Sequence, residues 1–334
     1  MKRLLTILCF FSVLLCGCGQ AEPEMSPVAT DIPVTVVTEA PATETPVTMP
    51  PAVESEAAAL VEAPPPAVST VLVAEPSGEQ EARCDDVVID YSHTEDGYIM
   101  ARFMGQTEKR LKFRVIGPTT VYTYNLPLNQ WTVFPLSDGN GSYQAAVYIN
   151  TYDSKYALVM TAQFEVTLED EFAPFLRPNQ YVDYADAPDT VAKGAELCAG
   201  LEHPLEKVAA VYDFTVDNLA YDYDRAATVK SGYLPVLDEV LTEKKGICFD
   251  YAALMTAMLR SQEVPCKLVV GYAGSIYHAW ISVWTEEDGW VDGAIFFDGS
   301  VWKRMDPTFA SSNYRSDEIM DFIEHGTYTV KYLY

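Results

Sequence analysis

The spacing of hydrophobic positions divides the chain into two parts with different periods. Between residues 86 and 172, runs rich in β-branched and aromatic residues are separated by turn signals, which is typical of strands. The runs are VVIDYS, GYIMARFM, KRLKFRVIG, TTVYTYN, WTVFPL, SYQAAVYIN and YALVMTAQFEVTL. Seven short strands predict an immunoglobulin-like β-sandwich, and SDGNGS at 137–142 predicts one tight hairpin within it. No cluster of polar residues in these strands suggests a reaction or a ligand, which favours a spacer or packing partner over a binding module.

From about residue 186 the period becomes helical. PLEKVAAVYDFTVDNLAYD at 204–222 predicts an amphipathic helix, and SGYLPVLDEVLTEKKG predicts a turn, a short helix and a glycine stop. In 247–263, apolar residues three and four apart predict a helix that is buried along one stripe: Ala252, Met255, Met258 and Leu259. CKLVVGYAG, HAWISVW and VWKRMDPT then predict three strands, and the last 20 residues predict a helix and a terminal strand. The second part is therefore expected to be an α+β domain.

Three polar residues in this part suggest nucleophilic chemistry. Cys248 falls in the first turn of its helix, where unpaired N–H groups and the helix dipole favour a thiolate. His278 begins an apolar strand, and Asp306 ends the next strand before Pro307. A cysteine beside an apolar face is more often inert packing, the interpretation that we give to Cys198 and Cys266. A zinc site is disfavoured because the ligands are scattered, without a CxxC or HxxxH pair.

Three segments together resemble the signature segments of the transglutaminase-like superfamily. They are GICFDYAALMTAMLR, HAWISV and WKRMDPT, in the family's order and approximate spacing, within roughly residues 200–310. The resemblance implies a papain-like cysteine protease-type core in which Cys248 is the nucleophile, His278 its base and Asp306 the group that orients the histidine. The stretch GWVDGAIFFDGSVW at 289–302 departs from the family pattern and is expected to be an extra hairpin.

The chemistry expected of this triad is acyl transfer at amide bonds. A thiolate attacks the carbonyl, the imidazolium protonates the leaving amine, and a thioester remains. The backbone N–H of Cys248 can donate to the developing oxyanion, and Tyr233 is a candidate second contact from its position alone. The acceptor is water in peptide or protein hydrolysis and an amine in transglutamination. The family resemblance favours hydrolysis, because many exported bacterial relatives are thought of as peptidases.

The expected partner is a protein or peptide substrate at the cell surface, and the sequence predicts neither a cofactor nor a metal. The rival hypothesis is a catalytically silent transglutaminase-like binding or scaffold lipoprotein. It would require a broken triad, whereas all three residue types are present in this sequence. The oligomeric state and a Cys198–Cys266 bridge both stay open.

The N-terminus predicts export. Residues 1–18 combine an early basic pair with an apolar run from Leu4 to Leu15 that is short for a membrane span, as in a signal peptide. The end of the run, LLCGC, resembles the lipobox of bacterial lipoproteins, which implies lipidation at Cys18. An ordinary signal peptide cut elsewhere is the less favoured alternative. The expected location is extracytoplasmic, lipid-anchored to the bacterial cell membrane.

Composition predicts the remaining domain boundaries. Residues 19–83 hold 11 of the 21 prolines and 11 acidic residues against one arginine, with no aromatic residue, which predicts a disordered Pro/Glu/Thr-rich tether. The sandwich is expected at 84–175 and the catalytic domain at 176–334. The formal net charge of −26 argues against nucleic acid as a partner and against electrostatic adsorption to anionic lipid.

Overall fold

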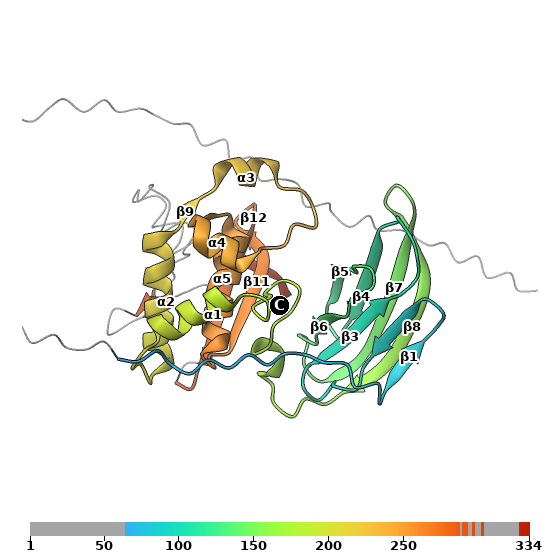
Figure 1. Cartoon of the computed structure of the whole chain (residues 1–334), viewed down its shortest axis with the longest axis horizontal. Helices are drawn as coiled ribbons and strands as arrows, with labels where there is room; N and C mark the ends of the chain where they lie inside the picture. The colour runs from blue at the N-terminus through green and yellow to red at the C-terminus, as the bar shows by residue number, and fades with distance from the viewer. Residues whose placement is uncertain (1–63, 288, 293–295, 298–301, 304–326) are drawn as a thin grey trace, which may run out of the picture.

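The computed structural model describes residues 64–287, 289–292, 296–297, 302–303 and 327–334. The predicted signal peptide with Cys18, most of the predicted tether and Asp306 lie outside the described residues. The described part has two lobes, a β-sandwich and a helical lobe built on a third sheet (Figure 1). No helix in the described ranges has the length and apolarity needed to cross a bilayer.

The first lobe consists of two antiparallel four-stranded sheets. Inner positions alternate with outer ones along the strands, as in the buried and half-buried alternation of Leu111–Ile116. The rings of Phe113 and Phe134 stack across the two sheets with centroids 4.1 Å apart. One sheet has the order β1 (Glu81–Arg83), β2 (Val87–Asp90), β3 (Tyr98–Phe103) and β6 (Thr132–Pro135); the other has the order β5 (Val121–Asn125), β4 (Leu111–Ile116), β7 (Gly141–Tyr152) and β8 (Lys155–Val166). All seven predicted strands are confirmed.

The predicted hairpin at 137–142 is wrong. β6 pairs with β3, and β7 pairs with β4 and β8, so the strands on either side of SDGNGS belong to different sheets. The turn carries the chain across the sandwich, and the Tyr143 hydroxyl donates to the backbone oxygen of Gly139 at 2.9 Å. Turn residues mark where a strand ends, but they do not say which strand is paired next.

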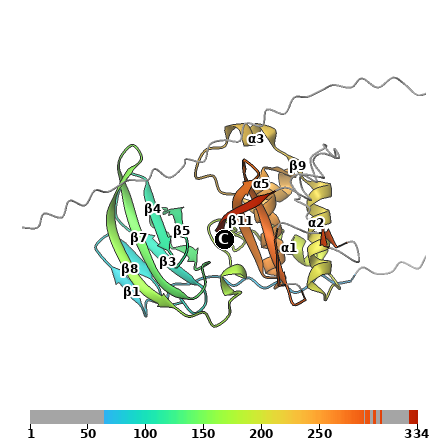
Figure 2. The same cartoon turned by 180° about the vertical axis from the view of Figure 1, so that it is seen from behind.

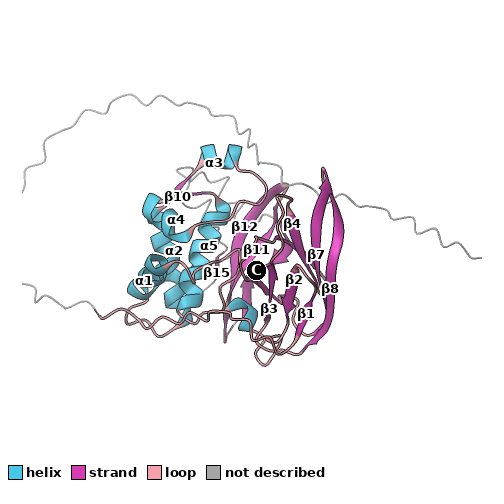
Figure 3. Cartoon of the chain, turned by 45° about the vertical axis from the view of Figure 1, so that its right-hand side comes forward, coloured by secondary structure: helices cyan, strands magenta, loops and turns pink. Residues whose placement is uncertain are grey.

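The second lobe places helices against an antiparallel sheet. The sheet has the order β13 (Gly289–Asp292), β12 (Ile276–Thr285), β11 (Cys266–Ala273) and β16 (Tyr328–Leu333). The helices lie on the face of this sheet that is turned away from the sandwich (Figures 2 and 3). They are α1 (Pro188–Leu197), α2 (Pro204–Asn218), α3 (Tyr223–Thr228), α4 (Leu237–Glu243) and α5 (Cys248–Ser261). The short elements are the 3-10 helix η1 (Ala173–Phe175) and the pairs β9 (Ala220–Tyr221) with β10 (Lys245–Gly246) and β14 (Phe296–Phe297) with β15 (Trp302–Lys303).

These elements confirm the helices predicted between residues 204 and 263 and most of the strands predicted for this lobe, with two differences. The helix predicted before the terminal strand lies outside the described residues. The predicted third strand appears as β15, which pairs with β14, whereas β13 is the strand beside β12. The helix α4 does not stop at a glycine, because Lys244 takes the left-handed conformation at its end, with φ 51°. Gly246 lies two residues further on, in β10.

The helix α5 is buried on every side, not along one stripe. Residues 249–261 are all buried, because α1, α2 and α4 cover the face opposite β11 and β12. The buried set includes the guanidinium of Arg260, which is 1% exposed. Its three hydrogen bonds go to the backbone oxygens of Cys266, Arg177 and Tyr334, at 2.8, 2.7 and 2.6 Å. One side chain thus joins the end of α5 to β11, to the residue after β16 and to the segment between β8 and α1, residues 167–187, called the interlobe segment below.

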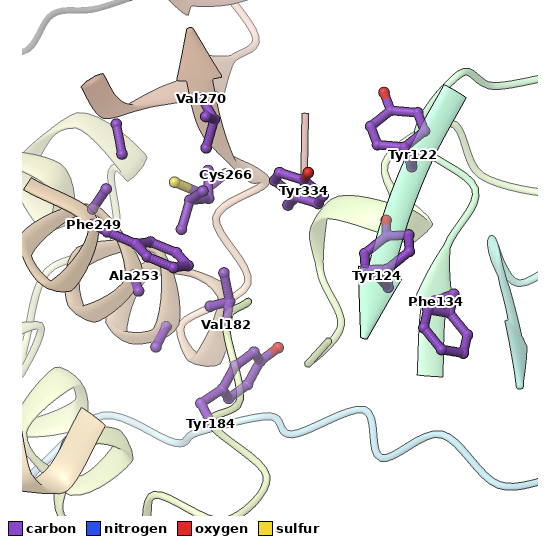
Figure 4. Close-up of a cluster of buried hydrophobic side chains, with 14 of the residues drawn as sticks. Tyr122, Tyr124, Phe134, Val182, Tyr184, Phe249, Ala253, Cys266, Val270 and Tyr334 are labelled. Atoms are coloured by element: carbon purple, nitrogen blue, oxygen red, sulfur yellow. The ribbon is translucent and has the colours of Figure 1, made fainter. Parts of the chain in front are cut away.

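Tyrosines join the two lobes. Tyr334 stacks on Tyr181 with ring centroids 4.0 Å apart, and its edge meets Tyr122 and Tyr124 of β5 at 5.7 and 5.8 Å. In Figure 4, Tyr334 lies between these β5 rings and side chains of α5, including Phe249. The hydrophobic core therefore runs continuously from the sandwich to the helical lobe.

Residues 64–83, which composition assigned to the predicted tether, pack against the folded lobes. From Pro64 the chain is extended and lies along both lobes (Figure 1). The N–H groups of Ala67 and Thr70 donate to Ala195 and Ser261 at 2.9 and 2.8 Å, and Glu81–Arg83 is the edge strand β1. Valine and alanine between residues 67 and 74 supply an apolar stretch within an otherwise tether-like composition, which explains why composition alone missed this docking.

We expect Arg260→Lys to lower the free energy of unfolding by about 3 kcal/mol, because an ammonium cannot reach three oxygens that a planar guanidinium binds together. Urea denaturation measures the change. Arg83→Lys is the matched control, since the Arg83 side chain lies at the surface beside Glu81, and it should leave the midpoint unchanged. Equal midpoints for the two variants would contradict the role of Arg260.

Candidate functional site

The first turn of α5 is fixed by a carboxylate within the same turn. Asp250 is fully buried and accepts the N–H of Ile247 at 2.7 Å, which satisfies one of the donors at the helix start. Gly246 leaves room for it, since a Cβ there would lie 2.5 Å from the Asp250 Cβ. Cys248 is the first residue of the helix and is half-buried. The sequence Gly-Ile-Cys-Phe-Asp thus places a thiol at a helix N-terminus by local packing.

Asp250 also binds the segment that covers this helix start. It accepts the Tyr233 hydroxyl at 2.6 Å and a guanidinium N–H of Arg225 at 3.4 Å. Arg225 donates to the Tyr233 oxygen at 3.1 Å, which closes a triangle of three side chains. Burial raises the pKa of Asp250, and the hydrogen bonds from Tyr233 and Ile247 act in the opposite direction. Burial and the carboxylate together raise the pKa of Tyr233.

His278 lies on the strand that packs against α5. It is 4% exposed, and its ring stacks on Trp280, two residues along the same face of β12, with centroids 6.2 Å apart. Gly271 is its partner on β11. A Cβ at Gly271 would lie 2.8 Å from the Trp280 ring and 2.0 Å from the Thr329 oxygen, so only glycine lets β16 and Trp280 approach beside His278.

Cys248 and His278 line the same pocket, a cavity of about 120 Å³. Its walls come from the helix start, from β12, from the segment between α3 and α4, and from the interlobe segment. Most of the lining is apolar or aromatic. The lining includes Tyr181, Val229, Lys230, Tyr233, Leu234, Phe249, Val270, Tyr277 and Tyr334. A thiol and an imidazole at the wall of one largely apolar pocket have the composition of a thiol-enzyme site.

The structure describes three of the predicted site residues and places them together. It brings Cys248, His278 and Tyr233 to one pocket, whereas Asp306 lies outside the described residues. The Tyr233 hydroxyl donates its proton to Asp250, so a contact with an oxyanion would require that bond to break. Among the described residues, no group of three or more His, Cys, Asp or Glu side chains is placed to hold a metal ion.

The four cysteines of the described chain are free thiols in different surroundings. Cys84 is exposed and Cys248 half-buried, while Cys198 and Cys266 are buried and do not form the bridge that the sequence left open. Burial raises the pKa of Cys266 to about 11, against the influence of the nearby Arg260. Burial also raises the pKa of Cys198. Both buried thiols are consistent with inert packing.

The second lobe is a mixed α/β fold with a thiol at a helix start and a histidine on the strand that packs against this helix. Residues 192–293 match the family model of the transglutaminase-like superfamily. This part of the chain is therefore a transglutaminase-like domain.

Curated relatives match parts of the chain. The uncharacterized protein YebA of Bacillus subtilis (strain 168) is 28% identical over 200 residues, 53% of this chain and 27% of YebA. A protein-glutamine gamma-glutamyltransferase of Pseudomonas aeruginosa is 29% identical over 119 residues, 31% of this chain and 17% of the transferase. The chain thus spans about a quarter or less of each of these relatives.

Two solved structures match the chain at low sequence identity and low TM-score. A Cytophaga hutchinsonii protein provisionally described as a cysteine protease is 17% identical, with a TM-score of 0.33 over 63% of this chain and 78% of that one. Red sea bream transglutaminase is 13% identical, with a TM-score of 0.27 over 70% of this chain and 56% of that one.

Local sequence marks only some of the residues that build the site. Asp250, which holds the covering segment without lining the pocket, has a local signal, because it is an acid in the first turn of a helix that follows a glycine. Asn125 of the sandwich and Tyr181 of the interlobe segment reach the pocket only through the packing of the lobes. Nothing in their local sequence marks them.

We expect Asp250→Ala to lower the free energy of unfolding by about 2–4 kcal/mol, because it removes the acceptor for buried donors of Ile247, Tyr233 and Arg225. Asp250→Asn should cost less, since its amide oxygen can still accept the Ile247 N–H. Chemical denaturation tests both variants. Glu239→Ala removes an exposed acid from the first turn of α4 and serves as the control. A loss no larger than the control's would contradict the role of Asp250.

In a Cys84→Ser background, iodoacetamide at pH 7 should modify Cys248 far faster than Cys266. With a pKa of about 11, Cys266 has roughly one thiolate in ten thousand molecules at that pH, and it is buried. His278→Ala should slow the labelling of Cys248 at least tenfold, measured by peptide mass spectrometry. Equal, slow alkylation of both thiols would contradict a nucleophilic Cys248.

Proposed function

We propose that this protein is a surface-anchored thiol enzyme that performs acyl transfer at amide bonds. The observation that carries the proposal is that Cys248, at the N-terminus of α5, and His278, on the facing strand, line one pocket. Residues 192–293 match a superfamily that includes enzymes of this kind, which supports the same reaction class.

In the proposed mechanism, the Cys248 thiolate attacks the carbonyl carbon of an amide. The backbone N–H of Cys248 has no helical partner at its position and donates to the oxyanion. The protonated imidazole of His278 gives its proton to the leaving amine, which leaves an acyl thioester on Cys248. Water or a primary amine then attacks the thioester while His278 accepts its proton, and the carbon–sulfur bond breaks to release the acyl product and return the Cys248 thiolate. We assign the orientation of the imidazole to Asp306.

The acceptor in the second half-reaction decides whether the enzyme is a peptidase or a cross-linker. We favour hydrolysis, because water is abundant and transfer to an amine needs a site that excludes it. The name of the Pseudomonas aeruginosa relative supports the other acceptor, with a glutamine side chain as donor. An informative assay must therefore offer both acceptors at once.

The rest of the chain is proposed to hold this domain at the membrane. Residues 1–18 are the proposed lipoprotein signal with lipidation at Cys18, and the chain from there to residue 63 is the proposed tether. The antiparallel sheets with strand orders β1-β2-β3-β6 and β5-β4-β7-β8 support an immunoglobulin-like assignment for residues 84–175. The proposed location is the outer face of the bacterial cell membrane.

The test is incubation of the protein with a cell-surface protein fraction and a biotinylated primary amine. New peptide termini or deamidated glutamines would identify hydrolysis, and biotin on proteins would identify transfer. Cys248→Ala should abolish both products while keeping the parent's melting temperature, because a small side chain at a helix start contributes little packing.

A parent protein that yields neither product, with Cys248 alkylated as slowly as Cys266, would instead support the catalytically silent scaffold. Products that persist in Cys248→Ala would place the chemistry elsewhere.

A further inference from the structure

The β-sandwich supplies a wall of the pocket that holds Cys248. Asn125, the last residue of β5, lines this cavity together with Cys248 and His278. Gly232, between α3 and α4, lines the same cavity beside Asn125 and has a left-handed φ of 89°. A Cβ at Gly232 would lie 2.8 Å from Nδ2 of Asn125, so a side chain at residue 232 would displace the Asn125 amide.

The orientation of the Asn125 amide is fixed by its neighbours. Lys112, its cross-strand partner on β4, donates from Nζ to Oδ1 at 2.9 Å. An ammonium only donates, so the atom that faces it must be the amide oxygen. Nδ2 is therefore the atom turned toward Gly232. Gln180 donates to the backbone oxygen of Asn125 at 2.8 Å, which holds this end of β5 against the interlobe segment.

Aromatic packing holds the wall in place. Tyr124, the residue before Asn125, meets the rings of Tyr181 and Tyr334 at 5.6 and 5.8 Å. Tyr181 in turn meets Phe249, the residue after Cys248, at 5.5 Å. The amide is thus positioned relative to the thiol through a chain of ring contacts between the lobes.

We propose that Asn125 is a specificity-determining residue that donates a hydrogen bond from Nδ2 to a backbone carbonyl oxygen of a peptide whose amide is presented to Cys248. The inference rests on the proposed function of this pocket. A side-chain amide that reads a backbone carbonyl selects an extended peptide over a small isolated amide, and does so without selecting a side chain. The substrate class is therefore a peptide segment that binds along the pocket wall formed by Asn125 and residues 229–234.

The experiment uses two alkylating probes on the Cys84→Ser protein: iodoacetamide, and an N-acetylated tetrapeptide chloromethyl ketone. The concentration dependence of Cys248 labelling by the ketone gives a binding constant and a maximal rate. Asn125→Ala should weaken ketone binding about tenfold, the effect of one lost hydrogen bond. The maximal rate and the iodoacetamide rate should stay within twofold of the parent, because neither depends on that bond.

Variants of similar size refine the assignment. Asn125→Asp keeps an acceptor for Lys112 but has no donor, so it should weaken ketone binding as Asn125→Ala does. Asn150→Ala is the control, because the side-chain amide of Asn150 donates to backbone oxygens of its own hairpin, those of Asp153 and Lys155. It should bind the ketone like the parent.

A glycine pair tests the geometry of this wall. Gly232→Ala should reduce ketone labelling at least tenfold by displacing the Asn125 amide, and adding Asn125→Ala in the same chain should cause little further loss, because the hydrogen bond is already absent. Gly139→Ala has a similar positive φ of 76° with open space around it, so it controls for backbone strain and should leave labelling unchanged.

The outcomes separate this inference from the proposed function. Rapid iodoacetamide labelling of Cys248 with unchanged ketone binding in both Asn125 variants would overturn the role of Asn125 and leave the nucleophile intact. The same holds for a parent whose ketone labelling never saturates. Slow iodoacetamide labelling of the parent would contradict the proposed function itself, and the peptide inference with it.

Discussion

The position of the candidate nucleophile depends on a carboxylate buried inside the first turn of its own helix. Asp250 accepts the Ile247 N–H, and the same oxygens bind Tyr233 and Arg225 from the covering segment. A buried carboxylate is costly unless its oxygens are bound, so the helix start and the covering segment stabilise each other through it. The wall of the pocket and the helix start that carries the thiol are therefore parts of one hydrogen-bonded unit.

The other end of α5 follows the same principle with the opposite charge. Arg260 binds backbone oxygens from three separate segments, one of which is Tyr334 beside the pocket. Because Tyr334 also stacks on Tyr181 and meets the rings of β5, this contact connects the helix end to the sandwich. The docked segment from residue 64 adds a second connection along the outside of both lobes. These contacts argue against a sandwich that is merely a spacer.

Local patterns in the sequence predicted the helices and strands well, but they predicted poorly which strands pair and which helix faces are covered. The seven strands and α5 were recognisable because period and turn residues are properties of the local chain. The hairpin at 137–142 was wrong because pairing depends on distant strands, and the single buried stripe of α5 was wrong because three other helices cover its outer face. Cys248 and His278 could be proposed from family-like segments, whereas Asn125 reaches the pocket only through a lobe interface that no local pattern encodes.

Close approaches around the pocket depend on three glycines. Gly246, Gly271 and Gly232 each lack a Cβ where one would collide, next to Asp250, beside the His278 strand and against Asn125. A glycine in such a place costs conformational entropy in folding, and it allows neighbouring groups to come close together. The three approaches lie around the helix start, the histidine strand and the covering segment, so in the proposed enzyme they would hold the walls of the site close to the bond that reacts.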